Sequence, residues 1–259
     1  MPFFDKHLPD VIERLQRGGK EVVLSTLALV MNEREVQQMH DIAQMPDILI
    51  EANDISVVRL LSNKPHMIGP YINTYNEGTL SYFADKGAKR IALPWELPMS
   101  SITKLGTART KVEIEVQVFG RIPLAISARC YSARAHGLHK DGCRYVCGEH
   151  QDGMDVETLD ETSFLAVNGL QTLSSHYTEL SDHISQMQDV GVSGFRLSPH
   201  GLDMTKVSDL YRQVLAHKTS PEELRNHLNE MHFPMVFADG FLHGVPGAEF
   251  RQTLGQRAE

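Results

Sequence analysis

The three cysteines of this chain lie close together in the sequence. Cys130, Cys143 and Cys147 all fall within the stretch CYSARAHGLHKDGCRYVC. Thiolates are the preferred ligands of soft metals and of iron–sulfur clusters. On a helical turn, the step from Cys143 to Cys147 places both sulfurs on one face, and the preceding loop lets Cys130 approach from elsewhere. The spacing therefore predicts a metal centre with all three cysteines as ligands, in a loop at residues 127–150.

The residues around the three cysteines favour a metal centre over core packing or a disulfide. Core cysteines pack as small hydrophobic residues in apolar stretches, whereas these three lie among basic side chains and histidines. A disulfide framework needs an even number of cysteines, and no signal peptide is recognisable. Structural zinc stays open, with a fourth ligand from His136, His139 or His150. An iron–sulfur cluster normally has four thiolates, and this sequence supplies three.

The composition is that of a globular protein. The 259 residues, 41% of them hydrophobic and 22% charged, suffice for one large domain, and we expect a single barrel-like domain over residues 1–259. The net charge of −8 argues against a dedicated nucleic-acid surface. No apolar run is long enough for a membrane span, so we expect a cytoplasmic protein whose thiols stay reduced.

Short apolar runs alternate with amphipathic segments along most of the chain. Continuously apolar strands of this kind are typical of parallel strands that are buried on both faces. The runs predict strands at 21–26, 47–54, 66–73, 90–96, 163–167 and 194–199, and a helix at 176–187. Residues 111–119 instead alternate between apolar and polar side chains, which predicts a further strand that ends at Gly120. We predict a TIM-type (β/α)8 barrel that lacks its first strand, because the helix at 5–17 has no strand before it. The open edges should lie at 21–26 and 194–199. A doubly wound open sheet is the alternative fold.

Polar residues end the predicted strands. In a barrel these positions meet at the carboxyl-terminal rim, so the sequence predicts a polar pocket there, next to the cysteine loop. Some of these side chains are expected only to cap the following helix. The residues are Ser25, Thr26, Glu51, Asn53, Asp54, Asn73, Tyr75, Glu96, Asn168, Arg196, Ser198 and His200.

Several stretches together resemble a known family. They are SARCYSARAHGLHKDGCRYVC, FLAVNGLQTLS, FRLSPHG, KEVVLSTLALV, ILIEANDISVV, LPWEL and VEIEVQVFGRIPLAISARC. The chain resembles the collagenase-like peptidase family, and within it the iron–sulfur subunits of oxygen-independent ubiquinone biosynthesis. The resemblance implies a 4Fe-4S cluster on four cysteines, three of which match Cys130, Cys143 and Cys147. The fourth would lie in a segment upstream of Met1, and we expect the reading frame to extend there.

The resemblance also implies a function. It implies hydroxylation of the aromatic ring of a ubiquinone precursor without dioxygen, in a heterodimer with a UbiU-like subunit. The alternatives are an RNA-base hydroxylase of the same family and a non-catalytic partner protein that a metal stabilises. Peptidase activity is not expected, because no nucleophile elbow, HExxH motif or catalytic triad is recognisable. The sequence does not identify the residues that perform the chemistry.

Overall fold

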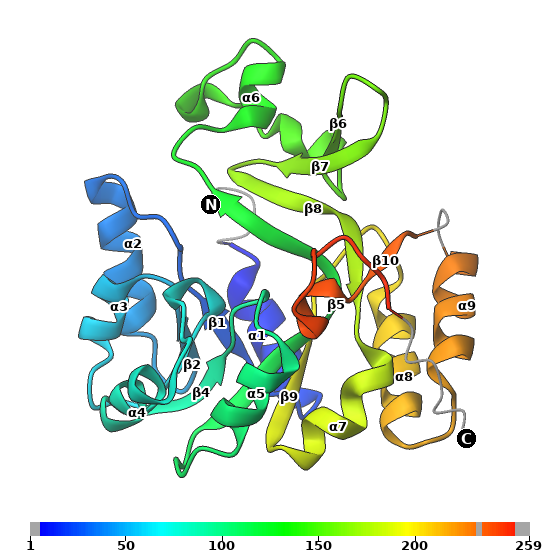
Figure 1. The fold of residues 1–259 in the computed structure, drawn as a ribbon. Helices are drawn as coiled ribbons and strands as arrows, with labels where there is room; N and C mark the ends of the chain where they lie inside the picture. Colours follow the sequence, from blue (N-terminus) through cyan, green and yellow to red (C-terminus); the bar gives the residue numbers. More distant parts are fainter. Residues whose placement is uncertain (1–5, 232–234, 252–259) are drawn as a thin grey trace.

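The computed structural model describes residues 6–231 and 235–251, which form a curled open sheet with helices on its outer side (Figure 1). Six strands run parallel in the order β1-β2-β3-β4-β5-β9. They are β1 Val23–Ser25, β2 Leu49–Ala52, β3 His66–Ile68, β4 Ala88–Ala92, the first part of β5 Glu113–Ile126, and β9 Val192–Leu197. Their buried apolar side chains, such as Ile68, Ile91 and Ile114, belong to one hydrophobic core.

Helices connect these strands and begin where side chains cap their first turns. Asn32, Asp54 and Asn76 each accept a hydrogen bond from a backbone N–H in the first turn of the following helix. The helices before the cysteine loop are α1 Leu8–Arg17, α2 Glu33–Ala43, α3 Ile55–Leu60, η1 Pro70–Ile72, α4 Glu77–Asp85 and α5 Met99–Gly106. Those after it are η4 Ser181–His183, α7 Ile184–Asp189, α8 Met204–Leu215, α9 Pro221–Met231 and η5 Gly240–His243.

The described strands form a half-barrel rather than the closed (β/α)8 barrel that the sequence pattern suggests. Within the described residues, β1 pairs only with β2, and β9 pairs only with β5. Both strands therefore leave one edge without a partner, as expected at these two positions. The sheet is also mixed rather than fully parallel. Its second part is antiparallel, which a βαβ pattern does not foresee.

Strand β5 is longer than its alternating pattern predicts, and it joins the two parts of the sheet. It bends at Gly120, whose φ of +108° is a conformation that other residues rarely adopt. A Cβ atom there would lie 2.6 Å from the Ser198 Cβ atom and 2.8 Å from the His200 Nε2 atom. The bend therefore needs glycine, and it brings the strand against the segment that follows β9.

The antiparallel part rises above the parallel strands (Figure 1). It consists of the end of β5 with β8 Gln171–Glu179, β7 Ser163–Asn168 and β6 Met154–Glu157, and the short β10 Phe237–Ala238 pairs with β8 in parallel. The helix predicted at 176–187 is wrong in its first residues, because 176–179 end β8. Thr178 pairs with Gly120 of β5 and with Ala238 of β10, so this part of the chain belongs to the strand. Helical structure begins only at Ser181.

No helix among residues 6–231 and 235–251 is both long and apolar enough to cross a bilayer.

Candidate functional site

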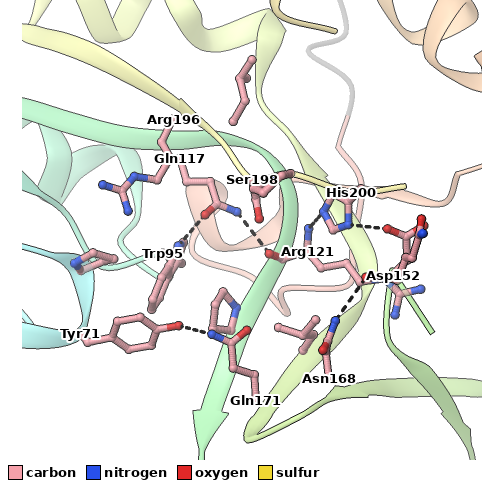
Figure 2. A pocket seen from close by; sticks show the side chains of 16 residues that line it. Tyr71, Trp95, Gln117, Arg121, Asp152, Asn168, Gln171, Arg196, Ser198 and His200 are labelled. Atoms are coloured by element: carbon pink, nitrogen blue, oxygen red, sulfur yellow. Dashed lines mark hydrogen bonds and ion pairs between the residues drawn. The ribbon is translucent and has the colours of Figure 1, made fainter. Parts of the chain in front are cut away.

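A polar cavity of about 480 Å³ lies at the carboxyl-terminal ends of the parallel strands, under the antiparallel extension. Figure 2 shows that its side chains come from both parts of the sheet. The polar and aromatic ones are Tyr71, Trp95, Gln117, Arg121, Gln151, Asp152, Asn168, Gln171, Arg196, Ser198 and His200. A concave site with a few converging polar groups is the usual form of a small-molecule site.

An ion-pair chain lies beneath this cavity, and its central carboxylate, Glu51, is buried. Arg196 contacts the Glu51 carboxylate, and its Nε atom donates to Glu115 Oε1 at 2.6 Å. Ser25 Oγ and Asn53 Nδ2 donate to Glu51 Oε1 at 2.9 and 3.0 Å. Glu51 is only 3% exposed, so it needs these partners to stay ionised. The chain holds the Arg196 guanidinium in one place at the cavity.

The Glu51 carboxylate gives a testable pH dependence. Burial raises its pKa, but Arg196, Asn53 and Ser25 outweigh that effect and hold it below its ordinary value of 4.5. The stabilisation is therefore fully present above pH 4.5, and it is lost as the pH falls through the folded-state pKa. Breaking a fully buried ion pair costs about 3–5 kcal/mol. Because Arg196 keeps its contact with Glu115 in Glu51→Gln, we expect this variant to lower the free energy of unfolding by a smaller amount, about 2 kcal/mol at pH 7.

Urea unfolding of the wild type and of Glu51→Gln at pH 7 and at acidic pH measures this effect. The difference between the two proteins should shrink as the pH falls below 4.5. Glu13→Gln is the control, since Glu13 forms an exposed pair with Arg17 on α1. A difference that stays constant with pH would show that Glu51 is not held as a carboxylate.

His200 is fixed between backbone and carboxylate. Its Nε2 atom accepts the Arg121 backbone N–H at 3.0 Å, and its Nδ1 atom lies 3.1 Å from Asp152 Oδ1. The neutral ring with its proton on Nδ1 satisfies both contacts. In that form the Nε2 lone pair is already used. His200 therefore positions the bend of β5, and the Arg121 N–H occupies the ring nitrogen that a general base would use.

Arg121 is the second guanidinium of the cavity and is largely buried. Its Nη2 atom donates to Asp155 Oδ1 at 3.1 Å, and its guanidinium lies 5.1 Å from the Tyr177 ring centre. Its Nε atom is buried and has no hydrogen-bond partner among the described residues. A buried donor without a partner is costly, so Arg121 keeps hydrogen-bonding capacity that its described neighbours do not use.

Aromatic and amide side chains line the opposite wall. The rings of Tyr71 and Trp95 meet edge to face with centres 4.9 Å apart. Trp95 Nε1 donates to Gln117 Oε1 at 2.8 Å, and Gln171 Nε2 donates to the Tyr71 hydroxyl at 3.0 Å (Figure 2). Burial raises the pKa of Tyr71 to about 12, so its hydroxyl stays protonated at neutral pH. This wall suits a flat ring that carries polar substituents.

The cysteine loop packs above the cavity as three short helical turns. They are α6 Tyr131–Ala135, η2 Lys140–Gly142 and η3 Val146–Glu149. Cys130 is buried and caps α6, where its sulfur accepts the Ala133 N–H at 3.4 Å. Ser132 Oγ accepts the Gly169 N–H at 3.0 Å and so ties α6 to the β7–β8 turn. Cys143 and Cys147 are partly exposed.

The three thiols are close enough to influence one another. Burial raises the pKa of Cys147, and the Cys130 and Cys143 thiols raise it further, while the Cys147 and Gly148 backbone N–H groups oppose the rise. Negative charges that repel one another are stabilised by a cation placed between them. The metal centre stays a prediction, for which this loop supplies three of the four thiolates of an iron–sulfur cluster. His136 and His150, whose ring centres are 6.3 Å apart, lie in the same loop and keep zinc open as the other metal.

A second hollow of about 380 Å³ connects the cysteine loop with the cavity. It is lined by Cys147 and Gly148 on one side, and it shares Gln151, Asn168 and His200 with the cavity. The expectation that the cysteine loop and the polar pocket are neighbours is therefore confirmed for Cys147.

The polar residues predicted at the rim lie in four different places in the structure. Asn168, Arg196, Ser198 and His200 line the cavity, and Asn73, Tyr75 and Glu96 line an adjoining hollow. Ser25, Thr26, Glu51 and Asn53 form the network beneath Arg196, where Thr26 Oγ1 donates to the Glu51 carbonyl. Asp54 only caps α3.

Two polar cavity residues on β5 were missed by sequence reasoning. Arg121 lies beyond residue 119, where the strand was expected to end, and the structure continues β5 to Ile126. Gln117 belongs to the polar face of an alternating strand, and such a face usually meets solvent. In the structure that face turns toward the cavity, and Gln117 contacts Trp95 there.

A comparison with known protein families shows to which family this chain belongs. The model of peptidase family U32 matches residues 2–252. The chain belongs to peptidase family U32. This confirms the resemblance to the collagenase-like peptidases at the level of the family. No solved structure matches the chain. The family name refers to proteolysis, but His200 is not arranged as the base of a serine peptidase, since its Nε2 atom accepts a backbone N–H.

Proposed function

We propose that this U32 chain is a UbiV-like iron–sulfur protein, required for the dioxygen-independent hydroxylation of the aromatic ring in ubiquinone biosynthesis. In this proposal Cys130, Cys143 and Cys147 hold a 4Fe-4S cluster, and a UbiU-like subunit completes a heterodimer. The observation that carries the proposal is the position of Cys147 in a hollow that adjoins the polar cavity. A cluster held there would supply one-electron transfer next to a bound substrate.

The cavity supports an aromatic substrate. A ring placed beside Tyr71 and Trp95 would pack against their edge-to-face pair. Its oxygen would lie near the positively charged guanidinium of Arg121, which lines the cavity. The role of these residues is to bind and orient the ring. The ordered ion-pair chain beneath Arg196 would keep that wall rigid while the substrate binds.

The adjoining hollow supports a substrate with an apolar tail. It has a volume of about 560 Å³ and shares Tyr71, Trp95 and Pro123 with the cavity. Leu124, Ile126 and other apolar side chains from the end of β5 line it. A ring bound in the cavity could therefore extend its prenyl chain along β5, where burial of each methylene stabilises binding by about 0.8 kcal/mol.

The fourth ligand of the proposed cluster has three possible sources. It could be a cysteine in a segment that precedes Met1, a residue of the partner subunit, or a histidine of the same loop. His136 and His150 make the last source concrete, and they also favour the second candidate function. That candidate is a non-catalytic partner protein whose zinc only stabilises the loop at 127–150.

The experiment is complementation under anaerobic conditions. A bacterial strain that lacks its own copy is given the wild-type chain or Trp95→Ala, together with the UbiU-like subunit. The proposal predicts that the wild type restores ubiquinone and that Trp95→Ala accumulates the unhydroxylated precursor, as measured by mass spectrometry of the lipids. Unchanged lipids with altered hydroxylated nucleosides in the RNA would favour the RNA-base hydroxylase. No change in either would contradict a hydroxylase role.

A further inference from the structure

A second group of metal-binding residues lies away from the cysteine loop. His183 in η4, Asp239 after β10 and His243 in η5 each offer one ligand atom, and these three atoms all lie within 4.8 Å of one another. The turn that carries His243 is drawn in red beside β5 in Figure 1. None of the three residues lines the cavity or the hollow at Cys147.

The three side chains form an asymmetric arrangement around one carboxylate oxygen. Asp239 Oδ2 lies 3.2 Å from His243 Nε2 and 3.9 Å from His183 Nε2, and the two rings have centres 5.1 Å apart. Asp239 Oδ1 accepts the Arg251 N–H at 2.6 Å, which fixes the carboxylate so that Oδ2 faces both imidazoles. A ligand carboxylate held in this way by a backbone donor is common at metal sites.

The burial of His183 also points to a bound ion. It is more than nine-tenths buried, and its Nε2 atom has no hydrogen-bond partner among the described residues. The distance of 3.9 Å to Asp239 is too long for a hydrogen bond. Leaving a buried ring nitrogen without a partner is costly, and this one faces the carboxylate oxygen that His243 also contacts.

We propose that His183, Asp239 and His243 bind a divalent transition-metal ion, with zinc as the best match. Two imidazoles and one carboxylate are a frequent three-ligand set for zinc, and water completes the tetrahedron. Metal–ligand bonds of about 2.0–2.2 Å place tetrahedral donors on the order of 3.3 Å apart. His243 and Asp239 already have this spacing, so binding mainly requires His183 to move toward them.

A small space lies beside Asp239. Asp239 also lines a small void of about 20 Å³, enough for about one water molecule. A divalent ion carries two positive charges and the Asp239 carboxylate carries one negative charge, so the site with its ion bound keeps a net positive charge. Because Asp239 follows β10 and His183 follows β8, the ion would tie together the ends of two paired strands.

Titration of the full chain with cobalt(II) tests this site, once a chelator has removed any metal that the purified protein holds. Cobalt bound by nitrogen and oxygen ligands gives d–d bands without thiolate charge transfer, so these bands distinguish the site from Cys130, Cys143 and Cys147. We expect about one cobalt ion per chain with such a spectrum, displaced by zinc. His243→Asn should weaken binding at least tenfold, and it should abolish the rise in melting temperature that zinc gives the wild type.

His227→Asn is the matched control, because His227 is exposed on α9 and lies 3.4 Å from the exposed Glu230 carboxylate. It should bind cobalt as the wild type does. His243 is chosen because it lies near the surface, and circular dichroism checks that the variant folds. X-ray absorption of the zinc-loaded wild type gives a second test, with nitrogen and oxygen neighbours expected. Absence of the d–d bands, or equal loss in both variants, would overturn the proposal.

Discussion

Cys147→Ser should remove at least nine-tenths of the iron and the visible absorbance of the anaerobically purified protein. Cys147 lies at the hollow that leads to the cavity, and its thiol is close enough to Cys130 and Cys143 for their charges to interact. A serine hydroxyl is a hard, weakly acidic ligand and replaces a thiolate poorly at iron. Iron analysis and the absorption spectrum, measured on the chain together with the proposed UbiU-like subunit, give the result.

The matched control for this variant lies in the same loop. His139 packs its ring against Gly142 in η2, so His139→Gln changes the loop surface without removing a thiol. If the cluster is held by cysteines, His139→Gln keeps its iron. Loss of metal in both variants, together with zinc in the wild type, would instead identify His139 as a ligand of a zinc site.

Arg225→Met should lower the free energy of unfolding by about 3–5 kcal/mol at neutral pH, since it leaves a buried carboxylate without its cation. Arg225 Nη1 donates to Glu179 Oε2 at 2.9 Å and to Asp182 Oδ2 at 2.7 Å. Glu179 is 1% exposed, and it also accepts the Tyr211 hydroxyl and the Ser181 N–H. Denaturant unfolding measures the change.

The pH dependence of this variant has a definite sign. Burial raises the pKa of Glu179, and Arg225 opposes the rise, so the variant should have a still higher pKa. The difference in the free energy of unfolding between the wild type and Arg225→Met should therefore shrink as the pH falls toward 4.5, the ordinary pKa of glutamate. Arg212→Met is the control, because its pair with Asp209 is exposed and should contribute at most about 0.5 kcal/mol. Equal losses in the two variants would contradict a buried pair at Arg225.

The parallel strands could be predicted because their signal is local. Residues 47–54 and 90–96 are apolar runs with polar ends; β2 lies within the first, and the second overlaps the end of β4. The carboxyl-terminal rim follows from the same pattern, so Arg196 and His200 could be identified from the sequence. The extent of barrel closure could not, since closure depends on pairing between strands far apart in the chain, which periodicity does not report.

The remaining errors have a tertiary cause. His176 and Tyr177 fit a helical pattern, yet β8 continues through them because β5 and β10 supply hydrogen-bond partners on both sides. Gly120 predicts the end of a strand and so hides Arg121, whereas its positive φ bends the strand and lets it continue. The His183, Asp239 and His243 group has no sequence spacing that suggests it, since η4 and η5 are brought together only by β8 and β10.

The metal content of the anaerobically purified wild-type chain tests the central proposal most directly. Iron, acid-labile sulfide and zinc should be measured on one sample, together with Mössbauer and absorption spectra. A 4Fe-4S cluster on Cys130, Cys143 and Cys147 predicts about four iron and four sulfide per chain, with broad absorption near about 400 nm that reduction bleaches. A colourless protein with zinc at the cysteines and no labile sulfide would contradict the iron–sulfur function.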